Sequence, residues 1–139
     1  NKGIKMLNSF IDEFKVGEHV PPGQYSPLVL AYIGDCVFEL FVRTYLISEK
    51  NCHVNDLHKA ATALVNNKSQ SDLYLKIKDC LTEEEAAIYK RGRNANSHPP
   101  KNALMRDYKS ATGIEALIGY LYICKNSERI VYLLKKLFE

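Results

Sequence analysis

The sequence lacks the short motifs that mark zinc sites and nucleotide-binding loops. Its four cysteines form no CxxC pair, and its four histidines show no HxxxH or HExxH spacing. No GxGxxG, GKS or GKT segment is present, which excludes the common phosphate-binding loops. We therefore expect four reduced thiols, as in a cytosolic protein, with Cys36 and Cys124 acting as small buried hydrophobes.

Strand patterns and membrane-spanning runs are also missing. No segment alternates apolar and polar residues over a strand length, and there is no internal repeat. The longest apolar stretch is broken by Gly34–Asp35 and again by Glu39, which indicates a core helix and not a membrane span. With no recognisable signal peptide, we expect a cytoplasmic protein of one all-α domain over residues 1–139. The net charge of +3 permits a nucleic-acid partner, but there is no strongly basic tail.

One apolar helix, predicted over Ser26–Ile47, dominates the sequence. Ser26 is a suitable N-cap and Pro27 a suitable first residue, and the apolar residues that follow predict burial on every side, Tyr32 included. Asp35, Glu39 and Arg43 recur at every fourth position and form one polar stripe. Since burying an unpaired charge is costly, Asp35 needs a partner.

A second apolar stretch, Ser110–Cys124, contains Glu115 as its single acid. Small residues one turn away on either side (Ala111, Thr112 and Gly119) give it a flat face for another helix. Packing this face on the first helix brings Asp35 and Glu115 together, and a divalent cation such as Mg²⁺ would relieve their repulsion. Spacing alone does not decide between this metal site and an ion pair of Arg43 with Asp35 or Glu39. Glu115 has no basic residue within a turn on its own helix, which favours a metal site over an ion pair for this acid.

The remaining helices are predicted from periodicity and caps. Thr82–Glu85 is a capping box that opens a helix ending near Gly92. Further helices are expected over 1–15, from a cap at Asn55 through Val65, from a weak break at 66–68 to Cys80, and from a cap at Ser127 onward. A separate turn is expected at 103–109, before the second apolar helix.

The segment 90–109 carries six positive charges against one acid. With Gly92 allowing close backbone approach, such a segment can contact the phosphates of a polyanion. The candidate RNA-binding residues are Lys90, Arg91, Arg93, Asn94 and Lys101, with Lys59 and Lys68 as the next choices. The plainer interpretation is a solvated basic loop.

These residues resemble a known family. YIGDCVFE at 32–39 is similar to the ribonuclease III signature, and IEALIGYLY at 114–122 to that family's second motif. KRGRNANSH at 90–98, PKN at 100–102 and DLHKAAT at 56–62 resemble more narrowly its Mini-ribonuclease III branch. The resemblance covers Ser26 to Arg129, and no double-stranded-RNA-binding domain follows, as in that branch.

The resemblance implies a helical endonuclease domain that forms a homodimer, binds Mg²⁺ and hydrolyses double-stranded RNA. It also implies maturation of the large-subunit (23S) ribosomal RNA precursor. By position, Asp35 and Glu115 match metal-binding catalytic acids. At two other positions where the family has acids, this chain has Ala31 and Thr112. The two remaining acids fit a site for one Mg²⁺. In such a site Glu39 or Thr112 would contact the metal through a water molecule.

Two other function classes stay open at this point. The first is a catalytically silent RNA-binding module of the same fold that acts in ribosome assembly, which the missing acids would explain. The second is a helical interaction protein whose polar stripe is structural.

Overall fold

The computed structural model describes residues 2–139, and the side chains of residues 7–139. Within these residues it contains seven α-helices, three short 3-10 turns and no strand, which confirms the all-α prediction. The helices are α1 (Lys2–Glu13), α2 (Pro27–Glu49), α3 (Val54–Leu64), α4 (Asn67–Ile77), α5 (Glu83–Arg93), α6 (Met105–Ile123) and α7 (Ser127–Leu134). The 3-10 turns are η1 (Pro22–Gln24), η2 (Lys78–Cys80) and η3 (Lys135–Phe138).

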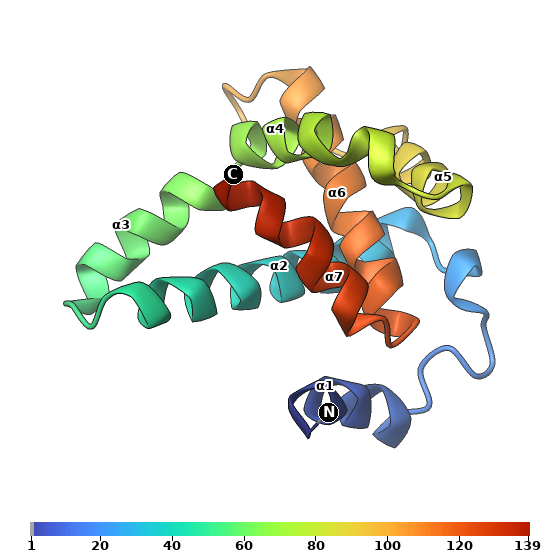
Figure 1. Ribbon diagram of the computed structural model, residues 1–139. Coiled ribbons are helices and arrows are strands. Elements are labelled where there is room, and N and C mark those ends of the chain that lie inside the picture. Colours follow the sequence, from blue (N-terminus) through green and yellow to red (C-terminus); the bar gives the residue numbers. More distant parts are fainter. Residues whose placement is uncertain (1) are drawn as a thin grey trace.

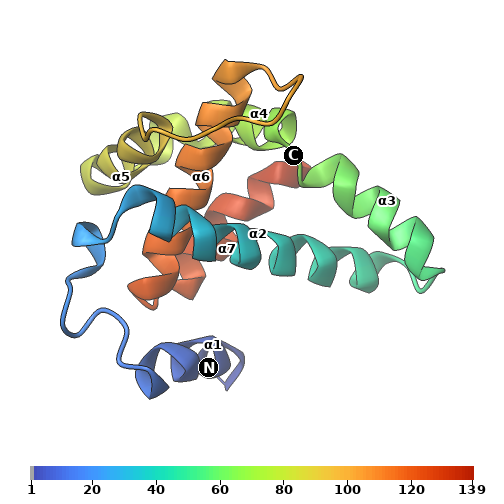
Figure 2. The same ribbon diagram turned by 180° about the vertical axis from the view of Figure 1, so that it is seen from behind.

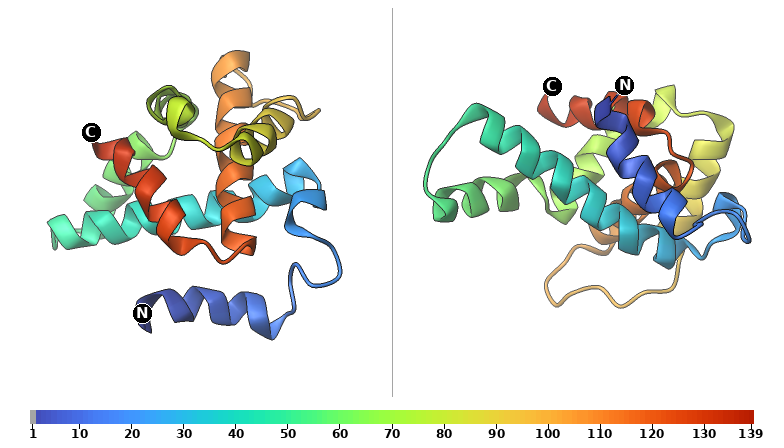
Figure 3. Two further views of the ribbon diagram at one scale, coloured as in Figure 1. Left: turned by 45° about the vertical axis from the view of Figure 1, so that its right-hand side comes forward. Right: turned by 90° about the horizontal axis from the view of Figure 1, so that it is seen from below.

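Two long helices, α2 and α6, organise the fold. They make the most extensive contact between any two elements, and α6 crosses α2 steeply (Figure 1; Figure 3, left). The helices α4, α5 and α7 surround α6, while α3 runs back from the far end of α2 (Figure 1). As a result α6 is almost completely buried from Ser110 onward, and its side chains form the centre of the core.

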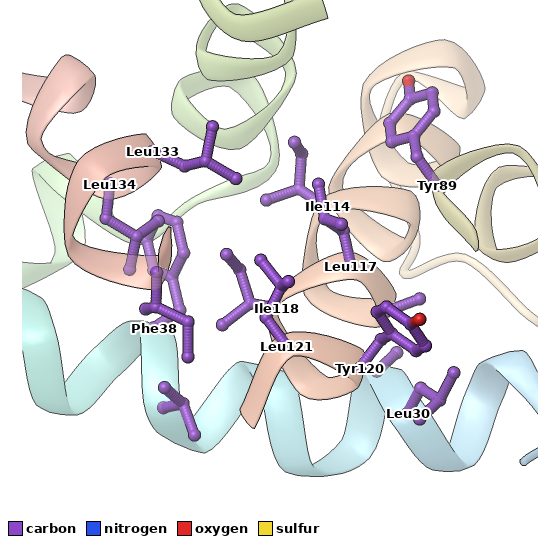
Figure 4. Packing of buried hydrophobic residues seen from close by; sticks show 14 of the residues in the cluster. Leu30, Phe38, Tyr89, Ile114, Leu117, Ile118, Tyr120, Leu121, Leu133 and Leu134 are labelled. Carbon is purple, nitrogen blue, oxygen red and sulfur yellow. The ribbon is translucent and has the colours of Figure 1, made fainter. Parts of the chain in front are cut away.

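The core is filled by large apolar side chains from five helices, α2, α4, α5, α6 and α7. Figure 4 shows Phe38, Ile118 and Leu134 converging from α2, α6 and α7. Each of these three side chains is fully buried, as is Leu73 of α4. Burying such a side chain contributes about 1.5–3 kcal/mol to stability. The core of the fold is therefore built around α6.

Local signals predicted most helix ends to within a few residues. Both hydrogen bonds of the capping box are present: Thr82 N–H donates to Glu85 Oε1 at 2.9 Å, and Glu85 N–H donates to Thr82 Oγ1 at 3.1 Å. Asn126, not Ser127, caps α7 by accepting from Arg129 N–H. The predicted cap at Asn55 is also wrong, since α3 begins at Val54 with His53 as its N-cap.

The predicted separate turn at 103–109 is wrong, because α6 runs unbroken from Met105. Its first turn holds Asp107, an acid suited to the positive end of the helix dipole. Figure 2 shows the connection from α5 as an extended loop that reaches the outer end of α6, from which the helix returns toward α2.

The prediction that α2 is buried on every side is wrong for the single chain. One face carries exposed residues at helical spacing, which we call the α2 stripe: Val29, Tyr32, Cys36, Leu40 and Ile47. Tyr32 is 81% exposed, and Cys124 at the end of α6 is exposed as well. All four thiols are free. The reason is geometric: the other helices pack against one side of α2 and leave the stripe uncovered.

No helix of the described chain combines the length and the apolar character needed to cross a membrane.

Candidate active site

The helices α2 and α6 touch backbone to backbone where they cross. A Cβ atom added to Gly34 would lie 1.7 Å from the carbonyl oxygen of Glu115, and one added to Gly119 would lie 1.9 Å from that of Leu30. Neither position can hold a larger residue without moving a helix. Asp35 follows Gly34 directly, so the close approach that the glycines permit also brings Asp35 beside Glu115.

Both carboxyl groups line one open hollow of about 510 Å³. Glu39 and Thr112 also face it, and the Thr112 hydroxyl donates to the Tyr108 carbonyl at 3.0 Å. The other lining residues are Leu28, Ala31, Tyr32, Ile33, Cys36 and Tyr108. Ala31 and Thr112 are the two positions at which the resemblance leads one to expect further acids, so both departures lie at this hollow.

Glu115 is destabilised as an anion. Burial and the neighbouring Asp35 raise the pKa of the Glu115 carboxyl from 4.5 to about 8, while the Gln70 side chain lowers it. Burial is the largest cause, and Asp35 acts through both hydrogen bonding and charge repulsion. The pair therefore favours a proton or a cation over two bare negative charges.

The structure also shows which acid Arg43 pairs with. Its Nη2 donates to Glu39 Oε1 at 2.7 Å, so the ion pair on the polar stripe joins Arg43 to Glu39. Among residues 7–139, Asp35 makes no ion pair within 4.0 Å. The structural alternative thus applies to Glu39 and not to Asp35.

The donor set fits Mg²⁺ better than a metal that needs many protein ligands. No group of three or more His, Cys, Asp or Glu side chains suited to a metal occurs among the described residues. Two adjacent carboxylates in an open, oxygen-bearing hollow match the sites in which Mg²⁺ keeps several waters and a substrate phosphate.

The candidate RNA-binding residues of α5 and its C-cap line two separate hollows. Lys90, Arg91 and Asn94 line a hollow of about 700 Å³ next to Pro27. Arg91 is already engaged there: Nη1 donates to the Gly23 carbonyl at 2.6 Å and Nη2 to the Tyr25 carbonyl at 3.0 Å. Its guanidinium thus ties the η1 segment to α5, which leaves fewer of its donors for phosphate.

Arg93 does not share this hollow with Lys90. With Lys68 and Arg106 it lines a hollow of about 330 Å³ beside the start of α6. Nearby acids offset part of the positive charge of this hollow. Lys68 Nζ pairs with Asp72 at 2.7 Å, and Arg106 Nε lies 3.9 Å from Asp107. Lys101 is exposed in the loop before α6.

Sequence reasoning missed Gln70, which is buried and lies close to Glu115. A signal was available, because Gln70 stands three residues before Leu73 and seven before Ile77. That spacing places a polar residue on the buried face of α4. Tyr108, at the edge of the hollow, gave no comparable signal.

Comparisons with known proteins identify the family of this chain. The family model described as "Ribonuclease III domain" matches residues 28–126. A Mini-ribonuclease 3 from Clostridium tetani is 48% identical over 114 residues, 81% of this chain and 76% of that protein. Another from a Thermoanaerobacter species is 46% identical over 111 residues, 79% of this chain and 78% of that protein.

A solved structure has a similar fold and a related sequence. The crystal structure of a Fusobacterium nucleatum protein superposes with a TM-score of 0.76 at 38% identity, covering 81% of this chain and 92% of that one. From the shared domain and the identity to proteins of that name, the chain belongs to the ribonuclease III family, in its Mini-ribonuclease 3 group, and is an endoribonuclease.

Proposed function

We propose that this protein is a Mg²⁺-dependent endoribonuclease that cleaves double-stranded RNA and matures the 23S ribosomal RNA precursor. It would act in the cytoplasm as a homodimer of single catalytic domains. The observation that carries the proposal is the adjacency of Asp35 and Glu115 in one open hollow. Kinship with Mini-ribonuclease 3 proteins supports the choice of RNA as substrate.

The two acids would hold the cation and so lose their mutual repulsion. When bound, Mg²⁺ supplies a Lewis acid that lowers the pKa of water and withdraws charge from a phosphoryl oxygen. Asp35 and Glu115 would hold that charge within the hollow that they line. Glu39, held by Arg43, and Thr112, held by Tyr108, would orient water beside them.

Recognition of the duplex would rest on phosphate contacts. A-form RNA is read by shape and through its phosphates and 2′-hydroxyls, since side chains cannot enter its narrow major groove. Arg93 and Lys68 line the hollow beside the start of α6. Lys90 and Asn94, which line the other hollow, and Lys101 would extend the contact, while Arg91 would hold the η1 segment against α5.

The dimer would explain the exposed α2 stripe. Two strands need two active centres, and a two-fold axis matches the near-symmetry of a duplex. The stripe borders the hollow, since Tyr32 and Cys36 belong to both. Its burial against a second copy would place two centres on one face.

Substitution of the acids tests the chemistry. Asp35→Asn and Glu115→Gln should each reduce Mg²⁺-dependent cleavage of duplex RNA by about 1,000-fold or more, because losing the cation removes several kcal/mol of transition-state stabilisation. Circular dichroism should show both variants folded. Glu128→Gln, at the exposed start of α7, is the matched control, since it removes one carboxylate far from the hollow in sequence, and it should retain wild-type activity. Wild-type turnover in either acid variant would disprove the assignment.

The alternative that the sequence left open, a catalytically silent RNA-binding module acting in ribosome assembly, is disfavoured by the kinship with endoribonucleases. Ala31 and Thr112 favour it, because two acids expected from the resemblance are absent from the hollow. The same assay separates the candidates: a silent module binds duplex RNA in a gel shift but yields no Mg²⁺-dependent products.

A further inference from the structure

One buried amide in the core has no hydrogen-bond partner. Among the buried side chains that the structure describes, Gln70 Nε2 is the single nitrogen or oxygen atom left without one. The Gln70 side chain is only 3% exposed. Buried polar groups in native proteins are nearly always hydrogen-bonded, and an unpaired one calls for a physical explanation. An apolar side chain of the same size would avoid the cost of burying the amide.

Gln70 is held firmly in the first turn of α4. Asn66 caps this helix by accepting from Ser69 N–H at 2.9 Å, and Gln70 N–H donates to the Asn66 carbonyl at 3.0 Å. The helix packs against α6, and burial of Gln70 directs its side chain toward that helix. The amide therefore projects from a rigid turn into the interface beside Glu115.

The Gln70 amide and the Glu115 carboxyl are neighbours. Gln70 is the one group whose effect on Glu115 favours its charged form, against burial and Asp35. An amide N–H stabilises a carboxylate in this way. The geometry nevertheless falls short of a hydrogen bond, because Nε2 has no partner within normal limits. A spare donor thus stands next to an acid that is also engaged with Asp35.

We propose that Gln70 is a positioning residue for Glu115: its amide donates to the Glu115 carboxylate when that group and Asp35 together bind a divalent cation. The inference rests on the proposed function, in which these two acids hold the metal. A carboxylate that binds a metal with one oxygen has lone pairs left, and hydrogen bonds to them fix its orientation. Loss of such a partner typically weakens metal affinity or activity by about 10- to 100-fold.

The test compares metal binding with folding stability. Gln70→Met keeps the length of the side chain and removes the donor. Without RNA, its affinity for Mn²⁺, followed by the electron paramagnetic resonance of the free ion, should fall by about 10- to 100-fold. Its denaturation midpoint without metal should equal or exceed that of the wild type, since a buried unpaired amide is removed. High Mg²⁺ should restore part of its cleavage activity.

Ser71→Ala is the matched control. Ser71 is the next residue on α4 and is also buried, but it faces the hollow of Lys68 and Arg93. Its Mn²⁺ affinity should equal that of the wild type.

Three results would contradict the proposal. Equal Mn²⁺ affinity in the wild type and Gln70→Met, with Glu115→Gln weaker than both, would reject the role of Gln70 and leave the proposed function intact. Equal affinity in the wild type and Glu115→Gln would reject both. A loss of Mn²⁺ affinity in Gln70→Met that merely follows an equal loss of stability would mark Gln70 as a packing residue.

Discussion

Gly34 lies directly against the backbone of Glu115: a Cβ atom at position 34 would stand 1.7 Å from the Glu115 carbonyl oxygen. This contact sets the crossing of α2 and α6 one residue away from Asp35. The contact links the packing of the core to the spacing of Asp35 and Glu115. A substitution at Gly34 should therefore lower both stability and activity.

The first prediction concerns this contact. Gly34→Ala cannot be accommodated without moving α2 or α6, because the clash is with backbone and not with a flexible side chain. We expect a loss of about 3 kcal/mol or more in the free energy of unfolding, at the upper end for overpacked cores. Urea denaturation measures it.

A second glycine serves as the control for that experiment. A Cβ at Gly23 would meet only Tyr120 Cε1 at 3.9 Å, an ordinary contact. Gly23→Ala should therefore leave stability within about 1 kcal/mol of the wild type or raise it slightly. Equal effects of the two substitutions would show that the α2–α6 contact is not tight.

The second prediction concerns pH. The pKa of Glu115 is raised to about 8 in the folded protein, so the folded state holds this proton more tightly than the unfolded state does. Between the ordinary value of 4.5 and about 8, the folded state then binds more protons, and the free energy of unfolding must fall as pH rises. Each unit of pKa difference is worth about 1.4 kcal/mol at most.

Denaturation in the presence of a chelator, between about pH 5 and pH 8, measures this fall. Glu115→Gln should flatten the profile, because an amide does not titrate. Glu128→Gln, at the exposed start of α7, is the control and should keep the wild-type slope. A wild-type profile as flat as that of Glu115→Gln would contradict the destabilised Glu115 anion.

The third prediction concerns RNA contact. Arg93→Ala and Lys101→Ala should each weaken binding to duplex RNA in Ca²⁺ and reduce the slope of log affinity against log salt by about one unit or less. Arg91→Ala should act differently. It removes two hydrogen bonds to the Gly23 and Tyr25 carbonyls and should lower the melting temperature.

Binding isotherms over a salt series decide this question. Unchanged slopes for Arg93→Ala and Lys101→Ala would mean that these cations are solvated and that RNA binds elsewhere. A wild-type melting temperature in Arg91→Ala would remove the structural role assigned to Arg91.

The fourth prediction concerns assembly. Light scattering should give about twice the monomer mass of 15.8 kDa. Leu40→Lys, in the middle of the α2 stripe, should shift the protein toward the monomer, because a charge would be buried in an apolar interface. Val131→Lys is the control: Val131 is similarly exposed, but on α7. A monomeric wild type, or equal effects of both variants, would reject the stripe as the interface.

Much of this protein can be predicted from short-range patterns. The capping box at Thr82, the apolar periods of α2 and α6, and the absence of strand alternation give an all-α fold. Asp35 and Glu115 stand out because each is an acid within an apolar helix, and Gly119 marks a face open to close packing. These signals work because helix periodicity and caps depend on residues within about a turn.

Other features were decided only by tertiary packing. Which side of α2 is covered depends on where α3, α5 and α6 lie. The α2 stripe was therefore expected in the core but is exposed. Lys90 and Arg93 are three residues apart in the sequence but line different hollows. The Arg91 guanidinium donates hydrogen bonds to backbone carbonyls of a segment distant in the sequence. Gln70 meets Glu115 only because α4 docks on α6. Periodicity determined which helices form and which residues share a face, but the burial of each face and the partner of each polar group arise from long-range contacts that no local pattern encodes.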